Sequence, residues 1–359
     1  MSGIFGLLTL SDTDRVFVTT EGQRALYDAT RMWVEKYNAD MASSLQIFVD
    51  GETPNHKERY YLPSGGRLDR RGGQAQSAAG KRTGSWDVAY PLEDFGRDLA
   101  WDDVSLGYMT PEQYQLQVDT ILVQNTNVVR FELLKAIFDN TARTFVDPLI
   151  GSLTVQPLAN GDSVVYPPVL GSETEATDNH YLESGYAASA ISDTNNPLVT
   201  IRDELEEHFG ASTGYSNLVV FINNAQSAKI SGLINFVPEP DRYIQVGNDT
   251  NVPTGLPPVP TSARVLGRCD GVWVAEWRFI PANYMVGIHL EAPAPLVKRV
   301  DTPSSGLGTG LQMVAQEKKH PIERLTWRHR FGFGVRNRLN GVVMELGTGG
   351  TYTIPTAYA

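Results

Sequence analysis

A stretch of 36 residues, 110–145, constrains the fold most, because neither glycine nor proline interrupts it after Pro111. Thr110 is a suitable N-cap, Pro111 suits a first helical turn, and Gln113 completes a capping-box pattern. A helix of this length would be a rod of roughly 50 Å. Its apolar residues recur mostly at helical spacing, which predicts one stripe packed on a sheet. They are Tyr114, Val118, Ile121, Leu122, Val128, Val129, Leu133, Ile137 and Phe138.

Two further features belong to this helical part of the chain. Asn125, Thr126 and Asn127 are poor helix formers, so the long helix could kink there. Upstream, Thr20 and Gln23 form a second capping-box pattern, which predicts a short helix after an arm of residues 1–20. One face of this short helix carries Leu26, Thr30, Trp33, Tyr37 and Met41.

The composition is that of an ordinary globular protein, with 359 residues of which 41% are apolar and 20% are charged. A formal net charge of -11 argues against broad attraction to nucleic acid, because phosphate binding needs a surplus of Lys and Arg. The single cysteine, Cys269, excludes an intramolecular disulfide and is expected to be a buried apolar residue rather than a catalytic thiol. No uncharged apolar run reaches transmembrane length, and we expect no membrane partner.

Residues 46–104 are the most unusual segment, because two extended arms flank a tip rich in small and basic residues. A two-stranded hairpin of that length would not be stable alone and is expected to lie on a partner surface. The basic residues of the distal part are Lys57, Arg59, Arg67, Arg70, Arg71, Lys81 and Arg82. The returning base is acidic, with Glu93, Asp94, Asp98, Asp102 and Asp103. This segregation predicts head-to-tail contacts, in which the basic tip of one copy meets the acidic base of the next.

The second half of the chain alternates short helices and strands, which predicts a compact α/β lobe followed by long closing strands. Helices are expected at residues 201–209 and 223–233, and strands at 218–222, 272–279, 284–290, 322–335 and 341–346.

The chain carries few signals of catalysis. Residues 210–214 match the G-x-S-x-G string around Ser212, but a helix precedes it and a strand follows, the reverse of a nucleophile elbow. A hydrolase remains an alternative that loss of activity in Ser212→Ala would support. The six histidines show no paired metal-site spacing, and the acidic runs at residues 93–103 and 203–207 are expected to be solvated faces. We therefore expect no enzyme activity, no catalytic residues, no cofactor and no metal. The histidines are His56, His180, His208, His289, His320 and His329.

The order of these elements resembles the major capsid protein of tailed bacteriophages, with the Hong Kong 97-type fold that encapsulins share. The closing segment ERLTWRHRFGFGVRNRLNGVVMELG is similar to the final peripheral strands of that family. The resemblance implies an α+β fold with an N-terminal arm and short helix (residues 1–45), an extended β-hairpin loop (46–104) and a peripheral domain with a long spine helix (105–175). An axial α/β domain (176–292) and a return to the peripheral domain (293–359) would follow.

The resemblance also implies a function. Such a chain self-assembles into hexamers and pentamers that form an icosahedral shell around double-stranded DNA, as a structural protein of the virion put together in the host cytoplasm. The hairpin of one subunit would lie over the spine helix of the next, so some apolar residues of that helix would be exposed in a lone subunit. If shells mature through a shape change, we expect the spine helix to bend at residues 125–127. Portal, scaffolding or decoration proteins would be partners, and packaged DNA would be bound non-specifically. The alternative is an encapsulin-type nanocompartment shell.

Some members of the family form a covalent Lys to Asn crosslink between subunits. In this sequence Lys57 or Lys81 in the hairpin, and Asn337 or Asn340 near the end, are conceivable partners, although no local motif supports the bond.

Overall fold

The computed structural model describes residues 23–61, 67–68, 85–209, 217–239, 257–319 and 322–359. Its chain divides into two compact units. The first unit comprises Met1–Met41, Asp94–Val129 and Gly306–Arg330, and the second comprises Ala42–Glu93, Arg130–Ser305 and Phe331–Ala359.

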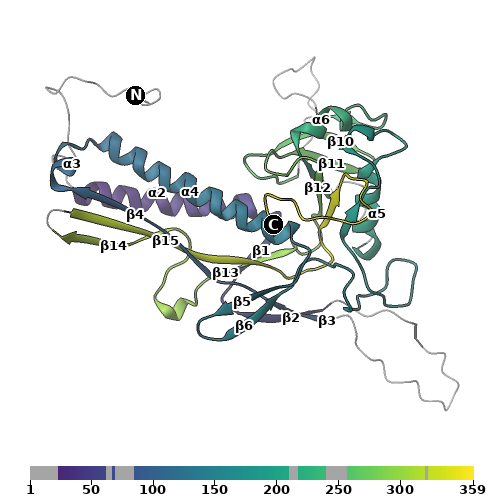
Figure 1. Cartoon of the computed structure of the whole chain (residues 1–359), viewed down its shortest axis with the longest axis horizontal. Helices are drawn as coiled ribbons and strands as arrows, with labels where there is room; N and C mark the ends of the chain where they lie inside the picture. The colour runs from purple at the N-terminus through teal and green to yellow at the C-terminus, as the bar shows by residue number, and fades with distance from the viewer. Residues whose placement is uncertain (1–22, 62–66, 69–84, 210–216, 240–256, 320–321) are drawn as a thin grey trace, which may run out of the picture. The chain divides into compact units, whose positions relative to one another are not determined.

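The first unit packs two helices beside antiparallel strands (Figure 1). Strand β14 (Gln312–Lys319) pairs antiparallel with β15 (Ile322–Val335), and β4 (Glu93–Asp102) also pairs with β15. The helices are α2 (Gln23–Leu45), which is longer than the short helix predicted, and α4 (Pro111–Phe138), while the short α3 (Asp103–Tyr108) follows β4. The core between them consists of Val34, Val118, Ile121, Leu122, Leu311, Leu325 and Trp327.

Helix α4 begins as the sequence predicts and ends earlier. The Thr110 N–H donates to Gln113 Oε1 at 3.1 Å, and the Gln113 N–H donates to Thr110 Oγ1 at 3.3 Å, which is the reciprocal capping box. The helix stops at Phe138 rather than at residue 145, because Asp139 Oδ1 accepts bonds from the Thr141 N–H at 3.0 Å and the Thr141 hydroxyl at 2.6 Å. Such a local turn competes with the helical ladder.

Residues 125–127, where the sequence allows a kink, are α-helical like their neighbours in α4. Asn125 is buried and donates from Nδ2 to the Tyr37 hydroxyl at 2.9 Å, and that hydroxyl also lies 2.8 Å from Thr126 Oγ1. The poor helix formers therefore join α4 to α2 through hydrogen bonds, and a bend during maturation stays a prediction.

The second unit contains a mixed seven-stranded sheet in the order β7-β16-β12-β8-β11-β10-β9 (Figure 1). Its strands are β7 (Tyr181–Glu183), β16 (Val342–Glu345), β12 (Tyr284–His289), β8 (Leu218–Ile222), β11 (Val272–Glu276), β10 (Arg264–Cys269) and β9 (Val237–Pro238). The helices are α5 (Pro197–Phe209) and α6 (Asn224–Ile230), with a 3-10 turn η2 (Ala188–Ala190). Helix α5 packs closely on β12 at Gly287, where a Cβ would lie 2.3 Å from Ile201 Cγ2. The predicted order of helix, strand and helix at α5, β8 and α6 is confirmed, and the sheet also includes the closing strand β16.

The remaining strands of the second unit form smaller ladders. Strand β1 (Val49–Thr53) pairs parallel with β13 (Leu296–Arg299), and β13 pairs antiparallel with the end of β15. Strand β2 (Lys57–Tyr61) pairs with β3 (Ser85–Ala89), and β5 (Arg143–Asp147) pairs with β6 (Gly151–Val155). A 3-10 turn, η3 (Pro303–Ser305), follows β13.

The long two-stranded hairpin expected for residues 46–104 is therefore wrong in the length of its arms. Pro54 separates β1 from β2, and Pro91 separates β3 from β4. Because proline has no N–H to donate to a ladder, each arm breaks at these positions. The outer segments join other sheets, and five residue pairs remain in the β2–β3 ladder.

The predicted closing strand at residues 322–335 is confirmed as β15, and its glycines have a steric reason. A Cβ at Gly332 would lie 2.2 Å from the carbonyl oxygen of Pro91. No larger residue fits where the chain between β3 and β4 crosses this strand.

Among the described residues, no helix is both long enough and apolar enough to cross a lipid bilayer.

Candidate assembly surface

The positive charge at the base of the hairpin is partly neutralised within the chain. Lys57 and Arg59, on β2, both bind Asp87 on β3, with Lys57 Nζ 3.2 Å from Oδ2 and Arg59 Nε 2.6 Å from Oδ1. The hydrogen bond from Arg59 lowers the pKa of Asp87 to about 2. All three side chains are exposed, so the pairs contribute little to stability. They nevertheless reduce the positive charge that Lys57 and Arg59, two of the seven predicted contact residues, can offer to another molecule.

The other predicted basic contacts lie further along the hairpin. Arg67 forms an ion pair with Glu173. Arg70, Arg71, Lys81 and Arg82 lie outside the described residues. Their contact with a neighbouring copy stays a prediction.

The acidic residues of β4 also have partners in the chain. Asp94 lies 3.8 Å from Arg330 Nε, and Asp98 pairs with Arg324, both across the ladder with β15. Arg324 lowers the pKa of Asp98 through its hydrogen bond. These arginines are more than 220 residues away in sequence, which is why pattern reasoning missed them.

The remaining acidic candidates lie at element boundaries. Asp102 is the N-cap of α3, accepting from the Ser105 N–H at 2.6 Å, and this bond lowers its pKa. Asp103 is the first residue of α3, and Glu93 is the first residue of β4. The predicted contact of these two with a second copy also stays a prediction.

From Gln115 onward the most exposed side chains of helix α4 are uncharged, with the half-buried Asp119 and Arg130 beside them and Lys135 near the Phe131 ring. The apolar residues on it are Leu116, Val123 and Phe131, which are 51%, 58% and 41% exposed. Their spacing places them within one quarter of the helix circumference. An exposed helix face is normally charged, so an uncharged apolar stripe is typical of a contact surface. The polar residues of this face are Gln115, Thr120, Gln124 and Asn127. The expectation that the helix leaves apolar residues uncovered is confirmed.

The turn of the β5–β6 hairpin is a second exposed apolar site. Val146, Leu149 and Ile150 are 69%, 94% and 45% exposed. Asp147 holds the turn by accepting from the Leu149 N–H at 2.9 Å and the Ile150 N–H at 3.2 Å. A well-ordered turn that displays apolar side chains is suited to insertion into another surface.

The asparagines considered for crosslinking are not accessible. Asn337 and Asn340 are both 0% exposed. Asn337 Nδ2 donates to the Pro293 carbonyl at 3.0 Å, and Asn340 Nδ2 donates to the His289 carbonyl at 2.9 Å. A lysine of another copy cannot reach them in this conformation, and both amides serve the fold instead.

Two further predictions from the sequence concern Cys269 and Ser212. Cys269 is 1% exposed, and burial raises its pKa to about 12, so the expectation of a buried apolar cysteine is confirmed. Ser212 lies outside the described residues, but α5 ends at Phe209 and β8 begins at Leu218, which is the expected order of helix before strand.

The acidic run at residues 203–207 is not a fully solvated face. Burial raises the pKa of Glu204 to about 7 and also raises the pKa of Glu207. The fold brings Glu207 together with Asp178, His180 and His208, a constellation that the histidine spacing did not predict. Asp178 and His208 are 30 residues apart, so no local motif could have found the group.

No protein-family model matches the sequence, and the comparison with curated proteins also gives no match. Solved structures do match. A chain from Mycobacterium phage Patience superposes with a TM-score of 0.67 at 20% identity, covering 100% of this chain and 98% of that chain. The capsid of Cyanophage P-SCSP1u gives 0.49 at 10% identity, over 85% and 88% of the two chains. The mature capsid of bacteriophage PhiM1 gives 0.48 at 12% identity, over 81% and 82%.

The resemblance expected from the order of elements is therefore confirmed at the level of the fold. The chain has a mixed α+β fold, which it shares over its whole length with the chain from Mycobacterium phage Patience.

Proposed function

We propose that this chain is a major capsid protein that self-assembles into hexamers and pentamers, which form an icosahedral shell around double-stranded DNA. The observation that carries the proposal is the similarity of the whole chain to a chain of Mycobacterium phage Patience. The domain organisation implied by the resemblance, with an extended loop, a peripheral domain and an axial domain, belongs to the same proposal. The protein would act in the virion after assembly in the host cytoplasm.

The exposed face of α4 would receive the hairpin of the next subunit. It offers the apolar side chains Leu116, Val123 and Phe131, so covering it would stabilise an interface. The apolar turn of β5–β6 would serve a second contact between copies. Both contacts are heterologous, which is the type that closes into rings.

Charge would set the direction of the hairpin contact. Arg70, Arg71, Lys81 and Arg82 lie between β2 and β3 and would meet acidic residues of the neighbour. The acidic side chains of β4 would take part by exchanging their internal arginine partners. A net charge of -11 fits a shell that holds DNA without binding it tightly. Portal, scaffolding or decoration proteins would complete the particle.

The hairpin role can be tested by shortening the loop. Tyr61 and Ser85 are paired residues at the end of the β2–β3 ladder, so an Asn-Gly turn can replace residues 62–84 and close it. We expect a folded subunit with an unchanged unfolding temperature and no shells in electron micrographs. A matched variant, in which Arg70, Arg71, Lys81 and Arg82 become Gln, keeps the loop length and is expected to weaken assembly at low salt. Normal shells from the shortened chain would contradict the proposed role.

A further inference from the structure

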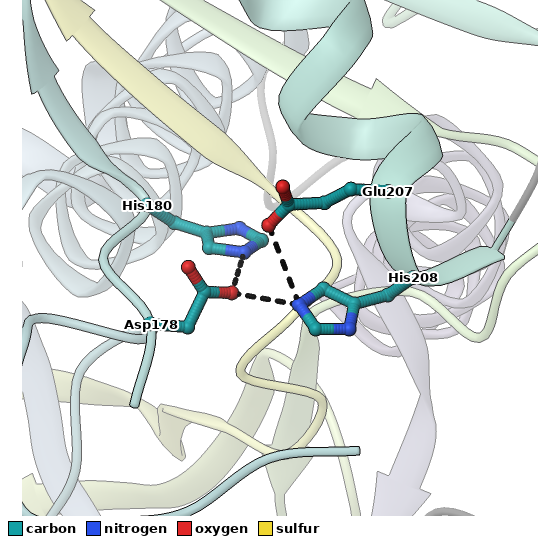
Figure 2. A group of neighbouring side chains, drawn as sticks. All are labelled: Asp178, His180, Glu207 and His208. Atoms are coloured by element: carbon teal, nitrogen blue, oxygen red, sulfur yellow. Dashed lines mark hydrogen bonds and ion pairs between the residues drawn. The ribbon is translucent and has the colours of Figure 1, made fainter. Parts of the chain in front are cut away.

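Two segments of the second unit bring four potential metal ligands together (Figure 2). Asp178 and His180 immediately precede β7, and Glu207 and His208 lie in the last turn of α5. One ligand atom from each residue lies within 4.8 Å of all the others. Figure 2 shows the carboxylates and the two imidazole rings pointing toward a common centre.

The closest approaches all involve imidazole nitrogens and carboxylate oxygens. His180 Nε2 and His208 Nε2 each lie 2.8 Å from the same atom, Asp178 Oδ2. His208 Nε2 lies 3.5 Å from Glu207 Oε1. Ligands of a tetrahedral zinc ion are about 3.3 Å apart, given bonds of about 2.0 to 2.1 Å. Around an ion the two 2.8 Å distances would therefore lengthen by about half an ångström, while ligand atoms now up to 4.8 Å apart would move closer together.

The ring of His180 faces an acceptor at each nitrogen. Its Nδ1 lies 2.9 Å from the carbonyl oxygen of Gly341, which can only accept, so Nδ1 carries a proton. Its Nε2 faces a second acceptor, the Asp178 carboxylate. A metal ion bound between Nε2 and this carboxylate would accept a lone pair from each of them.

The hydrogen bonds around these side chains resemble those that orient the ligands of known metal sites. A metal-binding histidine typically donates its other N–H to a carbonyl or carboxylate, as His180 does to Gly341. Asp178 Oδ1 accepts from the Asn179 N–H at 2.7 Å, which orients Oδ2 toward the rings. Nδ1 of His208 has no hydrogen-bond partner among the described residues. No hydrogen bond in this part of the chain therefore fixes which of the two ring nitrogens carries the proton.

The group is accessible from one side. The side chains of Asp178 and Glu207 are 15% and 30% exposed, whereas those of His180 and His208 are 0% and 4% exposed. An ion could enter past the carboxylates and bind the buried imidazoles. Two imidazoles with two carboxylates favour zinc and other first-row divalent ions over calcium and magnesium, which prefer oxygen ligands alone.

We propose that Asp178, His180, Glu207 and His208 bind one divalent transition-metal ion of the zinc class. The ion would connect the end of α5 to the segment that leads into β7, and it would stabilise that end of the seven-stranded sheet. This inference does not depend on the proposed function in capsid assembly.

The test uses tag-free full-length protein that has been treated with a chelator and dialysed at neutral pH. Zinc is added, and binding is measured by calorimetry and by elemental analysis after gel filtration. Cobalt serves as a spectroscopic probe, because a tetrahedral site with nitrogen ligands gives visible absorption bands. We expect one zinc per chain, a higher unfolding temperature with zinc, and cobalt bands that zinc removes.

Three variants decide between a metal site and a hydrogen-bonded network. His208→Ala and Glu207→Gln change ligands that are not fully buried, and each is expected to weaken zinc binding at least about tenfold. His56→Ala changes an exposed histidine on a different segment and is expected to bind zinc like the unaltered chain. Absence of stoichiometric zinc binding by the unaltered protein would overturn the proposal, and so would equal binding by His208→Ala. In either case protons alone hold the group together.

Discussion

His329 Nδ1 donates a 2.8 Å hydrogen bond to the side-chain oxygen of Asn125, in the middle of the long helix α4. Both residues are buried, at 3% and 8% exposure. The same asparagine donates from Nδ2 to the Tyr37 hydroxyl at 2.9 Å. One side chain therefore joins α4 to α2 on one side and to β15 on the other.

Replacing Asn125 with Leu is expected to destabilise the fold by about 1 to 3 kcal/mol, because the change leaves two buried polar groups without this partner. Urea unfolding followed by circular dichroism measures the change. Gln124→Ala is the control, since Gln124 is exposed on the same turn, and its effect should remain within about 0.5 kcal/mol. Equal effects of the two substitutions would show that the buried network does not stabilise the helix.

A buried ion pair should contribute more to the free energy of unfolding when one partner is removed than an exposed pair does. Arg299 lies 2.9 Å from Asp147, and their side chains are 7% and 5% exposed. Arg299→Met is expected to cost about 3 to 5 kcal/mol, because it leaves the buried carboxylate uncompensated. Arg324→Met, at the exposed pair with Asp98, should cost less than about 1 kcal/mol. Denaturant unfolding of both variants gives the comparison, and similar losses would contradict it.

The same carboxylate should give the protein a sensitivity to acid. Burial raises the pKa of Asp147, but the N–H groups of Leu149 and Ile150 together with Arg299 outweigh burial and lower the pKa below 3.8. The resulting stabilisation is complete above the unfolded pKa, near 3.8, and is lost as the pH falls through the lowered folded value. We expect Asp147→Asn to flatten the decline of unfolding free energy below pH 4. An unchanged slope in the variant would refute this role.

Gly332 is predicted to tolerate no side chain. Because a Cβ would lie 2.2 Å from the Pro91 carbonyl oxygen, Gly332→Ala should force backbone movement and cost about 1 to 3 kcal/mol or more. Gly107→Ala in α3 is the matched control, as nothing lies within 4 Å of its added Cβ. Thermal unfolding distinguishes them. A normal unfolding temperature for Gly332→Ala would show that β15 and the segment around Pro91 are not as close as described.

The exposed face of α4 should matter for assembly and not for folding. Changing Leu116 and Val123 together to Gln removes apolar surface that is more than half exposed and leaves the Phe131–Tyr358 ring contact in place. We expect particles to be replaced by small species in sedimentation velocity, with the unfolding temperature nearly unchanged. Ile234→Gln is the control, because Ile234 is 82% exposed on another part of the chain. Loss of assembly in the control would point to a general effect of surface polarity.

Local signals in the sequence predicted several elements well. The capping box at Thr110 and Gln113 gave the start of α4, a run of apolar residues gave β8, and β15 was also predicted with its bounds. These signals work because the residues that decide the structure lie next to each other in the chain. The end of α4 was missed, since the turn at Asp139 and Thr141 competes with a helix that the apolar pattern alone would continue.

Long-range relationships could not be predicted in the same way. The partners of Asp94 and Asp98 come from β15, so the acidic segment looked unpaired in the sequence. Pro54 and Pro91 divided the supposed hairpin, and the released strands paired with β13 and β15. The cluster around His180 and His208 exists only because α5 ends beside the start of β7.

Electron microscopy of the purified full-length protein at high concentration tests the central claim most directly. A capsid protein of this fold should form uniform shells, tubes, or rings of five and six subunits. Assembly should weaken in the α4 face variant and in the shortened hairpin. A chain that remains strictly monomeric under conditions where its fold is intact would contradict the account.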